Sequence, residues 1–258
     1  MSVGRALPYP VTRRANTDRR CVRCRLHASL CVCGLIPEPR LATRTRLVLF
    51  IHRREDRKST NTGRLAAECL ANSEVLVRGH AARPSDAFTW DRSTTVPVIL
   101  FPHERAIPLA QFADRALTLI VPDGTWRQAS KVRSRVLGLA DVPYVSLPPD
   151  VPSAYRLRAE SHDDGLATME AIARAMGILE GLHVRHALER VFRATVERTL
   201  WSRGTIATSD VVDGIPDRAS RHDPSSGQVS AQSPRALPSQ ATPEHASERS
   251  RLPRGARP

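Results

Sequence analysis

Residues 40–201 alternate short apolar runs with amphipathic segments, and this alternation constrains the fold more than any other feature. The apolar runs cover residues 45–52, 74–79, 96–102, 116–122 and 142–147. Helical patterns lie at about 61–71, 125–137, 166–180 and 183–201. Continuous apolar strands separated by helices are typical of a parallel sheet that is buried on both faces. We therefore predict an α/β domain with a mostly parallel sheet and helices on both faces.

Polar side chains follow two of these predicted strands directly. After the first strand come His52, Glu55, Asn61 and Thr62, and after the fourth come Asp123, Gly124, Thr125 and Trp126. Because ligands of open parallel sheets bind beyond the carboxyl ends of the strands, we expect these residues to line a pocket. Structural alternatives stay open: Asn61 or Thr62 as a helix cap, and Asp123 as a cap with Trp126 in the core.

Four cysteines near the N-terminus form a C-x2-C-x6-C-x-C array: Cys21, Cys24, Cys31 and Cys33. Two close pairs of thiolates complete the closed four-sulfur tetrahedron that structural zinc prefers. A thioredoxin-like redox pair would follow a strand, and no strand is predicted before this array. We therefore predict a structural Zn²⁺ site, and we expect the fifth cysteine, Cys69, to be a buried apolar residue on a helix.

The formal net charge is +13, and only two of the 39 basic residues, Lys58 and Lys131, are lysines. Because phosphate contacts dominate nucleic-acid affinity, this excess favours a polyanionic partner, with nucleic acid first. A GC-rich genome would favour arginine in any protein, so the charge does not identify the partner by itself. Four basic residues follow the Asp123 stretch, as RNA contacts or as a solvated face: Arg127, Lys131, Arg133 and Arg135.

The sequence contains no apolar stretch of the length that a signal peptide or a membrane helix needs. We therefore expect a soluble, cytoplasmic protein with no membrane contact. It also contains no G-x-G-x-x-G or Walker motif, which argues against a dinucleotide or ATP cofactor.

The chain divides into four parts by composition. We predict an N-terminal arm at 1–18, a zinc knuckle at 19–40, a catalytic domain at 41–202 and a tail at 203–258. The tail is rich in Ser, Pro, Ala and Arg without apolar periodicity, so we expect it to be disordered. It holds 8 arginines against 6 acidic residues, so nearly all of the net charge belongs to the other three parts.

Several stretches together resemble the DTW-domain family, which takes its name from an Asp-x-Thr-Trp motif, here Asp123 to Trp126. They are the cysteine array, the strand leading to His52 and Glu55, "TNTGRLA", "PDGTWRQASK", "YRLR" at 155–158 and "LATMEA" at 166–171. The resemblance covers roughly residues 19–200. It implies a fold related to the knotted SPOUT methyltransferases. It also implies a tRNA-uridine aminocarboxypropyltransferase, which moves the 3-amino-3-carboxypropyl group of S-adenosylmethionine to uridine N3 and releases methylthioadenosine.

This resemblance suggests roles for the candidate residues. Asp123 would accept or orient the proton of uridine N3, and Trp126 would stack on a base. Arg156 and Arg158 would hold the donor carboxylate and a phosphate, while Thr168 and Glu170 open a helix where Glu170 would pair with the donor amine. His52, Glu55, Asn61 and Thr62 are the remaining donor-site candidates, and Thr125 completes the motif.

Two other functions stay open from the sequence. One is a knotted RNA methyltransferase that uses the same donor, and the other is a non-catalytic RNA-binding module built on the zinc knuckle and the basic surface. The sequence also leaves open whether the protein is a monomer or a homodimer.

Overall fold

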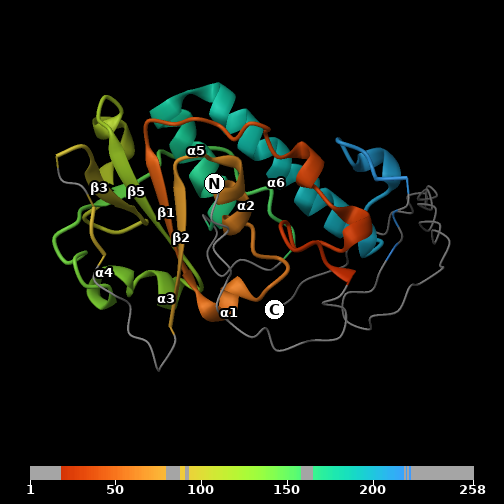
Figure 1. Cartoon of the computed structure of the whole chain (residues 1–258), viewed down its shortest axis with the longest axis horizontal. Coiled ribbons are helices and arrows are strands. Elements are labelled where there is room, and N and C mark those ends of the chain that lie inside the picture. Colours follow the sequence, from red (N-terminus) through yellow and green to blue (C-terminus); the bar gives the residue numbers. More distant parts are fainter. Residues whose placement is uncertain are drawn as a thin grey trace, which may run out of the picture.

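The computed structural model, shown in Figure 1, describes residues 19–79, 88–90, 93–157, 165–217, 219 and 221. The predicted N-terminal arm, residues 1–18, lies outside them. The centre is a six-stranded sheet with the order β2-β1-β5-β3-β6-β4. Its strands are β1 (Arg46–His52), β2 (Ser73–Arg78), β3 (Val96–Leu100), β4 (Ile107–Pro108), β5 (Leu117–Asp123) and β6 (Tyr144–Ser146). All paired strands run parallel, which confirms the predicted α/β class.

All five apolar runs of the sequence become strands. The most apolar ones, β1 and β5, lie side by side in the middle of the sheet, where side chains on both faces are covered. The short edge strand β4 was not predicted, because its two residues are too few to show a strand pattern. Its position at the edge fits the proline, which cannot donate a hydrogen bond to a neighbouring strand.

Three helices cover one face of the sheet (Figure 1): α2 (Gly63–Cys69), α5 (Thr168–Glu180) and α6 (Leu182–Ser202). Helix α5 packs on the sheet and α6 packs along α5, with Leu49, Leu119, Met169 and Leu188 in their common core. Gly181 turns the chain between α5 and α6 at φ 101°, a conformation that favours glycine. No helix of the described part is long and apolar enough to span a membrane.

The second face is covered by shorter elements, and here one prediction is wrong. The expected helix at 125–137 is two single turns, α3 (Trp126–Ala129) and α4 (Val132–Arg135). The side chain of Arg78 donates a hydrogen bond to the Gln128 carbonyl, at 2.5 Å. That carbonyl would otherwise accept from residue 132 in a continuous helix. Val132 and Val136 still pack against Phe50 in a second core, as the apolar spacing indicates.

The C-terminal segment is ordered for longer than the sequence indicates. Residues 203–217 pack along α6, with a 3-10 turn at Thr208–Asp210 and a buried Val211. Asp213 forms an ion pair with Arg190, and the Val212 N–H donates to Glu197. The predicted boundary of the disordered tail at residue 203 is therefore wrong, because Val211, Ile206, Ile215 and a few polar contacts hold a segment that has no periodicity. The residues from 222 onward lie outside the described part.

Candidate active site and metal centre

A pocket of about 660 Å³ opens at the carboxyl ends of the central strands. Its lining comes from the tips of β3 and β5, from the segments that follow β1 and β6, and from the start of α5. In a parallel sheet all these strand ends meet at one edge, so side chains far apart in the sequence converge there. The pocket brings together Glu55, Asn61, Thr62, Asp123, Thr125, Trp126 and Thr168 from the predicted site.

Asp123 is the last residue of β5 and lies buried at the pocket wall, with 4 % of its surface exposed. Its Oδ2 accepts a hydrogen bond from Asn61 Nδ2 at 2.7 Å, and its Oδ1 accepts one from Thr168 Oγ1 at 2.8 Å. Asp123 is not the cap of the following helix, because Thr125 occupies that position. The carboxylate therefore belongs to the pocket and not to helix capping.

Gly63 makes this arrangement possible. A Cβ atom at residue 63 would lie 2.6 Å from Asp123 Oδ2 and 3.1 Å from Thr168 Cγ2. Such contacts are shorter than van der Waals packing allows, so a larger residue would push the carboxylate aside. The glycine of the "TNTGRLA" stretch thus provides the space that Asp123 occupies.

The two other residues of the motif lie at the pocket as well. Thr125 is exposed and begins α3, and its N–H donates to Gln128 Oε1 at 3.0 Å. Trp126 is half-buried and packs against Phe101, with ring centroids 5.6 Å apart and planes at 60°. Both aromatic rings line the pocket, so Trp126 is part of its wall and is not enclosed in the core. Phe101 was missed as a site residue because it reads as the end of an apolar strand.

The segment after β1 contributes a buried acid to the pocket. Glu55 is 4 % exposed, lies on the short helix α1 (Arg53–Asp56) and forms an ion pair with Lys58. Thr62 is buried at the start of α2 and also lines the pocket. The sequence indicated these polar groups but not the helix α1, which is too short to show periodicity.

Three predicted site residues do not line the pocket. His52 ends β1 and caps the N-terminus of α1, where its Nδ1 accepts from the Arg54 N–H at 3.2 Å. Burial, followed by the charges of Arg78, Arg54 and Arg53, lowers the pKa of His52. Arg156 is exposed to solvent, away from the pocket lining, and Arg158 lies outside the described residues.

Glu170 is the third predicted site residue that does not line the pocket, and its carboxylate has a structural role. Its carboxylate accepts hydrogen bonds from Ser153 Oγ at 2.5 Å, from the Ala154 N–H at 2.7 Å and from the Ala167 N–H at 3.0 Å. It thereby fastens the segment after β6 to the start of α5. Tyr155 fastens the same segment to the loop after β1, because its hydroxyl donates to the Thr60 carbonyl at 2.8 Å. Ser153 and Tyr155 line the pocket and were not predicted.

Replacing Glu170 by Ala should therefore loosen one wall of the pocket. Three donors lose their acceptor, and each buried donor left without a partner costs about 1–3 kcal/mol. We expect the free energy of unfolding to fall by at least about 2 kcal/mol and amide hydrogen exchange to rise at residues 153–155. Denaturant unfolding with exchange mass spectrometry measures both. Unchanged exchange at these amides would contradict the assigned task.

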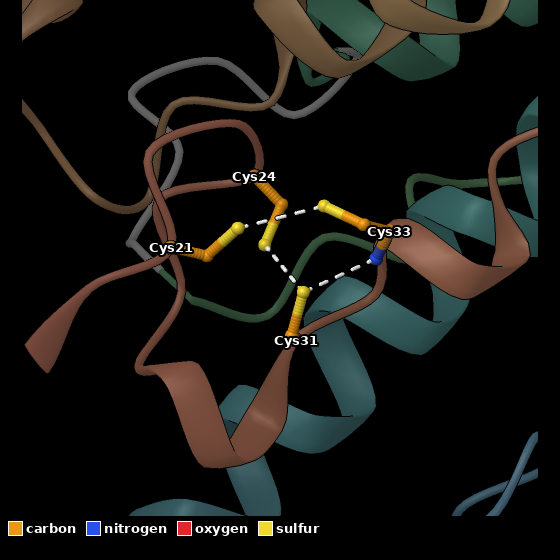
Figure 2. Close-up of side chains that lie close together, drawn as sticks. All are labelled: Cys21, Cys24, Cys31 and Cys33. Atoms are coloured by element: carbon orange, nitrogen blue, oxygen red, sulfur yellow. Dashed lines mark hydrogen bonds between the residues drawn. The ribbon is translucent and has the colours of Figure 1, made fainter.

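The four N-terminal cysteines form the second candidate site, and Figure 2 shows their side chains converging. Their sulfur atoms all lie within 4.8 Å of one another, with Cys21 to Cys33 at 3.5 Å and Cys24 to Cys31 at 3.7 Å. Sulfur atoms around a tetrahedral zinc ion are about 3.8 Å apart, given Zn–S bonds of about 2.3 Å. The set therefore fits a closed four-thiolate metal site, as the spacing predicts.

The protein holds this cluster against its main core. Leu30 and Val32, which flank Cys31, are buried in the core. The Arg198 side chain on α6 donates to the Cys31 carbonyl at 2.5 Å. Burial raises the pKa of Cys24 to about 11. For Cys21, burial acts in the same direction, but backbone N–H groups and neighbouring thiols outweigh it and lower the pKa to about 7. A dication would hold all four groups as thiolates, because coordination deprotonates a thiol.

Part of this chain is similar in sequence to several known proteins. The chain is 30% identical over 168 residues to tRNA-uridine aminocarboxypropyltransferase 2 of Macaca fascicularis, a match that covers 62% of this chain and 56% of that protein. It is 25% identical over 171 residues to the Drosophila melanogaster protein of the same name, covering 64% of this chain and 68% of that protein. The match to tRNA-uridine aminocarboxypropyltransferase A of Arabidopsis thaliana has 24% identity over 190 residues and covers 62% and 72% of the two chains. This chain thus spans little more than half the length of the macaque relative.

One solved structure and one family model complete the comparison. The SAM-dependent rRNA:acp-transferase Tsr3 from Vulcanisaeta distributa matches with a TM-score of 0.39 and 18% identity, covering 61% of this chain and 79% of that chain. Residues 18–200 match the DTW domain. Because this match includes the four cysteines, the whole sheet and nearly all of α6, the chain belongs to the DTW domain family.

Proposed function

We propose that this chain transfers the 3-amino-3-carboxypropyl group of S-adenosylmethionine to N3 of a uridine in tRNA. The observation that carries the proposal is the position of Asp123, the acid of the family motif, at the wall of the pocket and held there by two side-chain donors. The relatives from macaque, fly and Arabidopsis are named for this reaction, which adds support.

The pocket suits a donor of this size and charge. Its volume of about 660 Å³ lies within the usual range for small-molecule sites, about 300–1,000 Å³. S-adenosylmethionine supplies a sulfonium centre with an electrophilic carbon in the aminocarboxypropyl chain. The carboxylate of Asp123 offsets a positive charge, and Leu100, Val145 and Leu147 form an apolar wall for an adenine ring. The residues present therefore fit the donor.

In the proposed reaction, uridine N3 displaces the thioether from this carbon. A C–N bond forms, the C–S bond breaks and methylthioadenosine leaves with the electron pair of that bond, while the N3 proton is lost to a base. Asp123 is our candidate to accept or orient that proton. Asn61 and Thr168 each donate a hydrogen bond to this carboxylate, so the two side chains hold it in one orientation.

The aromatic pair beside Asp123 offers a place for the target base. Trp126 and Phe101 line the same pocket, and an aromatic side chain that stacks on a base contributes about 1–3 kcal/mol. Stacking the uracil there would place N3 near the strand tips. Orientation of this kind supplies several kcal/mol of catalysis without any covalent intermediate.

Mass analysis of the product tests the proposal. Purified protein is incubated with unmodified tRNA and S-adenosylmethionine. The tRNA is then digested to nucleosides, and their masses are measured by mass spectrometry. An aminocarboxypropyl group on uridine supports the proposal. A methyl group instead would indicate the knotted methyltransferase, and tight tRNA binding with no modification would indicate an RNA-binding module.

Replacing Gly63 by Ala should impair transfer mainly by displacing Asp123. The added methyl group would meet Asp123 Oδ2 at 2.6 Å, so the carboxylate must move. Because a small displacement of a positioned group can cost about 10²-fold in rate, we expect a loss of this size in kcat. Gly34→Ala is a matched control, since nothing lies within 4 Å of a Cβ at that glycine. Wild-type kcat in Gly63→Ala would contradict the proposed placement of the carboxylate.

We further propose that the four-cysteine cluster holds structural Zn²⁺. The set is closed, with four sulfur ligands and no open position, which is typical of structural and not catalytic zinc. The SPOUT-like knot, the cytoplasmic location and the choice between monomer and homodimer stay predictions of the sequence.

A further inference from the structure

A group of basic residues lies at the same edge of the sheet as Asp123, at the ends of β1 and β2. His52 and Arg78 are partners in the register of these strands. Because side chains alternate along a strand, both lie on the face of Val48 and Phe50, whereas Asp123 lies on the face of Ile51. Arg53 and Arg54 follow His52 on α1. We call Arg53, Arg54 and Arg78 the strand-tip arginines.

The charges of the strand-tip arginines are not compensated by acids. Among the described residues, none of the three forms an ion pair with a carboxylate. The Nε atoms of Arg53 and Arg78 are buried without a hydrogen-bond partner. Arg78 is only 7 % exposed, and its side chain donates a hydrogen bond to the neutral Gln128 carbonyl. A buried guanidinium without an anion is energetically unfavourable, so this arrangement calls for an anionic ligand.

The electrostatics of the neighbouring groups agree with a positive potential here. Burial, and after it the charge of Arg135, lowers the pKa of Arg78. Burial and the three strand-tip arginines lower the pKa of His52, which Glu55 opposes only in part. Several other arginines of the fold are paired with acids, such as Arg23 with Glu68 and Arg185 with Glu189.

We propose that the strand-tip arginines bind a phosphate of the RNA backbone beside the pocket that receives the target base. Guanidinium groups suit this ligand, because their planar N–H donors match two phosphate oxygens at once. β2 and β5 flank β1, so Arg78 and Asp123 are separated by two strand spacings, about 10 Å. The identity of the polyanion as RNA rests on the proposed function.

The surface around the strand-tip arginines extends the positive charge. Figure 1 shows α1, α3 and α4 along this edge of the molecule. Helices α3 and α4 with their connection carry Arg127, Lys131, Arg133 and Arg135, and Arg133 lies over the Tyr144 ring at 5.1 Å. A backbone that crosses α1 would therefore continue along α3 and α4. The basic residues of α3, α4 and their connection would then contact the same RNA backbone.

Binding of an unmodified tRNA transcript, measured by fluorescence anisotropy over a series of salt concentrations, tests the site. The variants are Arg53→Gln and Arg78→Gln, and the matched control is Arg193→Gln, which removes an exposed charge from α6. We expect each site variant to raise the Kd about tenfold and to lower the slope of log K against log salt by about one. Thermal melts accompany the binding data, and Arg53→Gln carries the test if Arg78→Gln fails to fold.

Two outcomes would overturn this site, and a third separates it from the proposed reaction. Arg53→Gln that binds tRNA with the Kd and salt slope of Arg193→Gln excludes a phosphate contact. A second experiment adds inorganic phosphate alone and measures the melting temperature. If phosphate stabilises wild-type protein but not Arg53→Gln, and Arg53→Gln binds tRNA as wild-type protein does, the site binds small anions and not RNA. If wild-type protein transfers nothing but Arg53→Gln still weakens tRNA binding, the proposed reaction fails and the phosphate site stands.

Discussion

Asp123→Asn is expected to lower kcat for transfer to tRNA about 10³-fold. General base groups contribute about 10²–10⁴ to a rate, and the amide keeps the size of the carboxylate while losing its charge and its basicity. Asn61 and Thr168 can still bond to the amide, so the pocket should keep its shape. Nucleoside mass spectrometry under single-turnover conditions measures the loss.

The control for this variant is Asp141→Asn, the same chemical change at an exposed carboxylate before β6. It should retain wild-type kcat, and both variants should keep the melting temperature and the zinc content. Wild-type turnover in Asp123→Asn would reduce that residue to a structural acceptor for Asn61 and Thr168. A large fall in its melting temperature would have the same meaning, since the activity would then be lost through the fold.

Cys24→Ser is expected to abolish zinc binding and to destabilise the whole chain. Cys24 is buried inside the cluster, and a serine hydroxyl is a poor zinc ligand, so the site loses one of its four sulfurs. Structural zinc contributes directly to folding, and the cluster is continuous with the main core through Leu30 and Val32. A loss of about 4 kcal/mol would lower the melting temperature by about 8–16 °C. Metal analysis and calorimetry measure the two effects.

Cys69→Ser provides the matched control, because Cys69 is equally buried but lies on α2 outside the cluster. Burial raises its pKa to about 12. Its sulfur is not one of the four that converge in the cluster. This variant should lose a little stability and keep its metal. A chelator should lower the melting temperature of wild-type protein and of Cys69→Ser, but not that of Cys24→Ser. Equal zinc content in both variants would contradict the metal centre.

The strands were predictable because a strand that is buried on both faces has a continuous apolar sequence. Continuous apolar runs such as 45–52 and 116–122 have no other stable use in a protein of this size. Elements whose ends depend on contacts with distant residues show no such pattern in the sequence. α3 ends where Arg78 takes the Gln128 carbonyl, and the segment after residue 203 is held by contacts with α6.

The candidate site divides in the same way. The polar residues after β1 and β5 were predictable, because the carboxyl ends of parallel strands share one edge. Their individual tasks were not. Glu170 resembles a ligand group in the sequence, yet its carboxylate holds Ser153 and Ala154, and His52 faces the strand-tip arginines. Such tasks depend on which neighbour lies within about 3 Å, which sequence spacing does not encode.

The sequence alone determined the parallel α/β class, the closed set of four thiols and the turn that carries Asp123, because periodicity and local spacing are properties of a chain segment. Only the tertiary structure decided that Asn61 and Thr168 hold the carboxylate, that Gly63 leaves space for it and that Arg78 lies beside His52. These contacts join residues whose distance along the chain says nothing about their distance in space, and the register of the sheet brings them together.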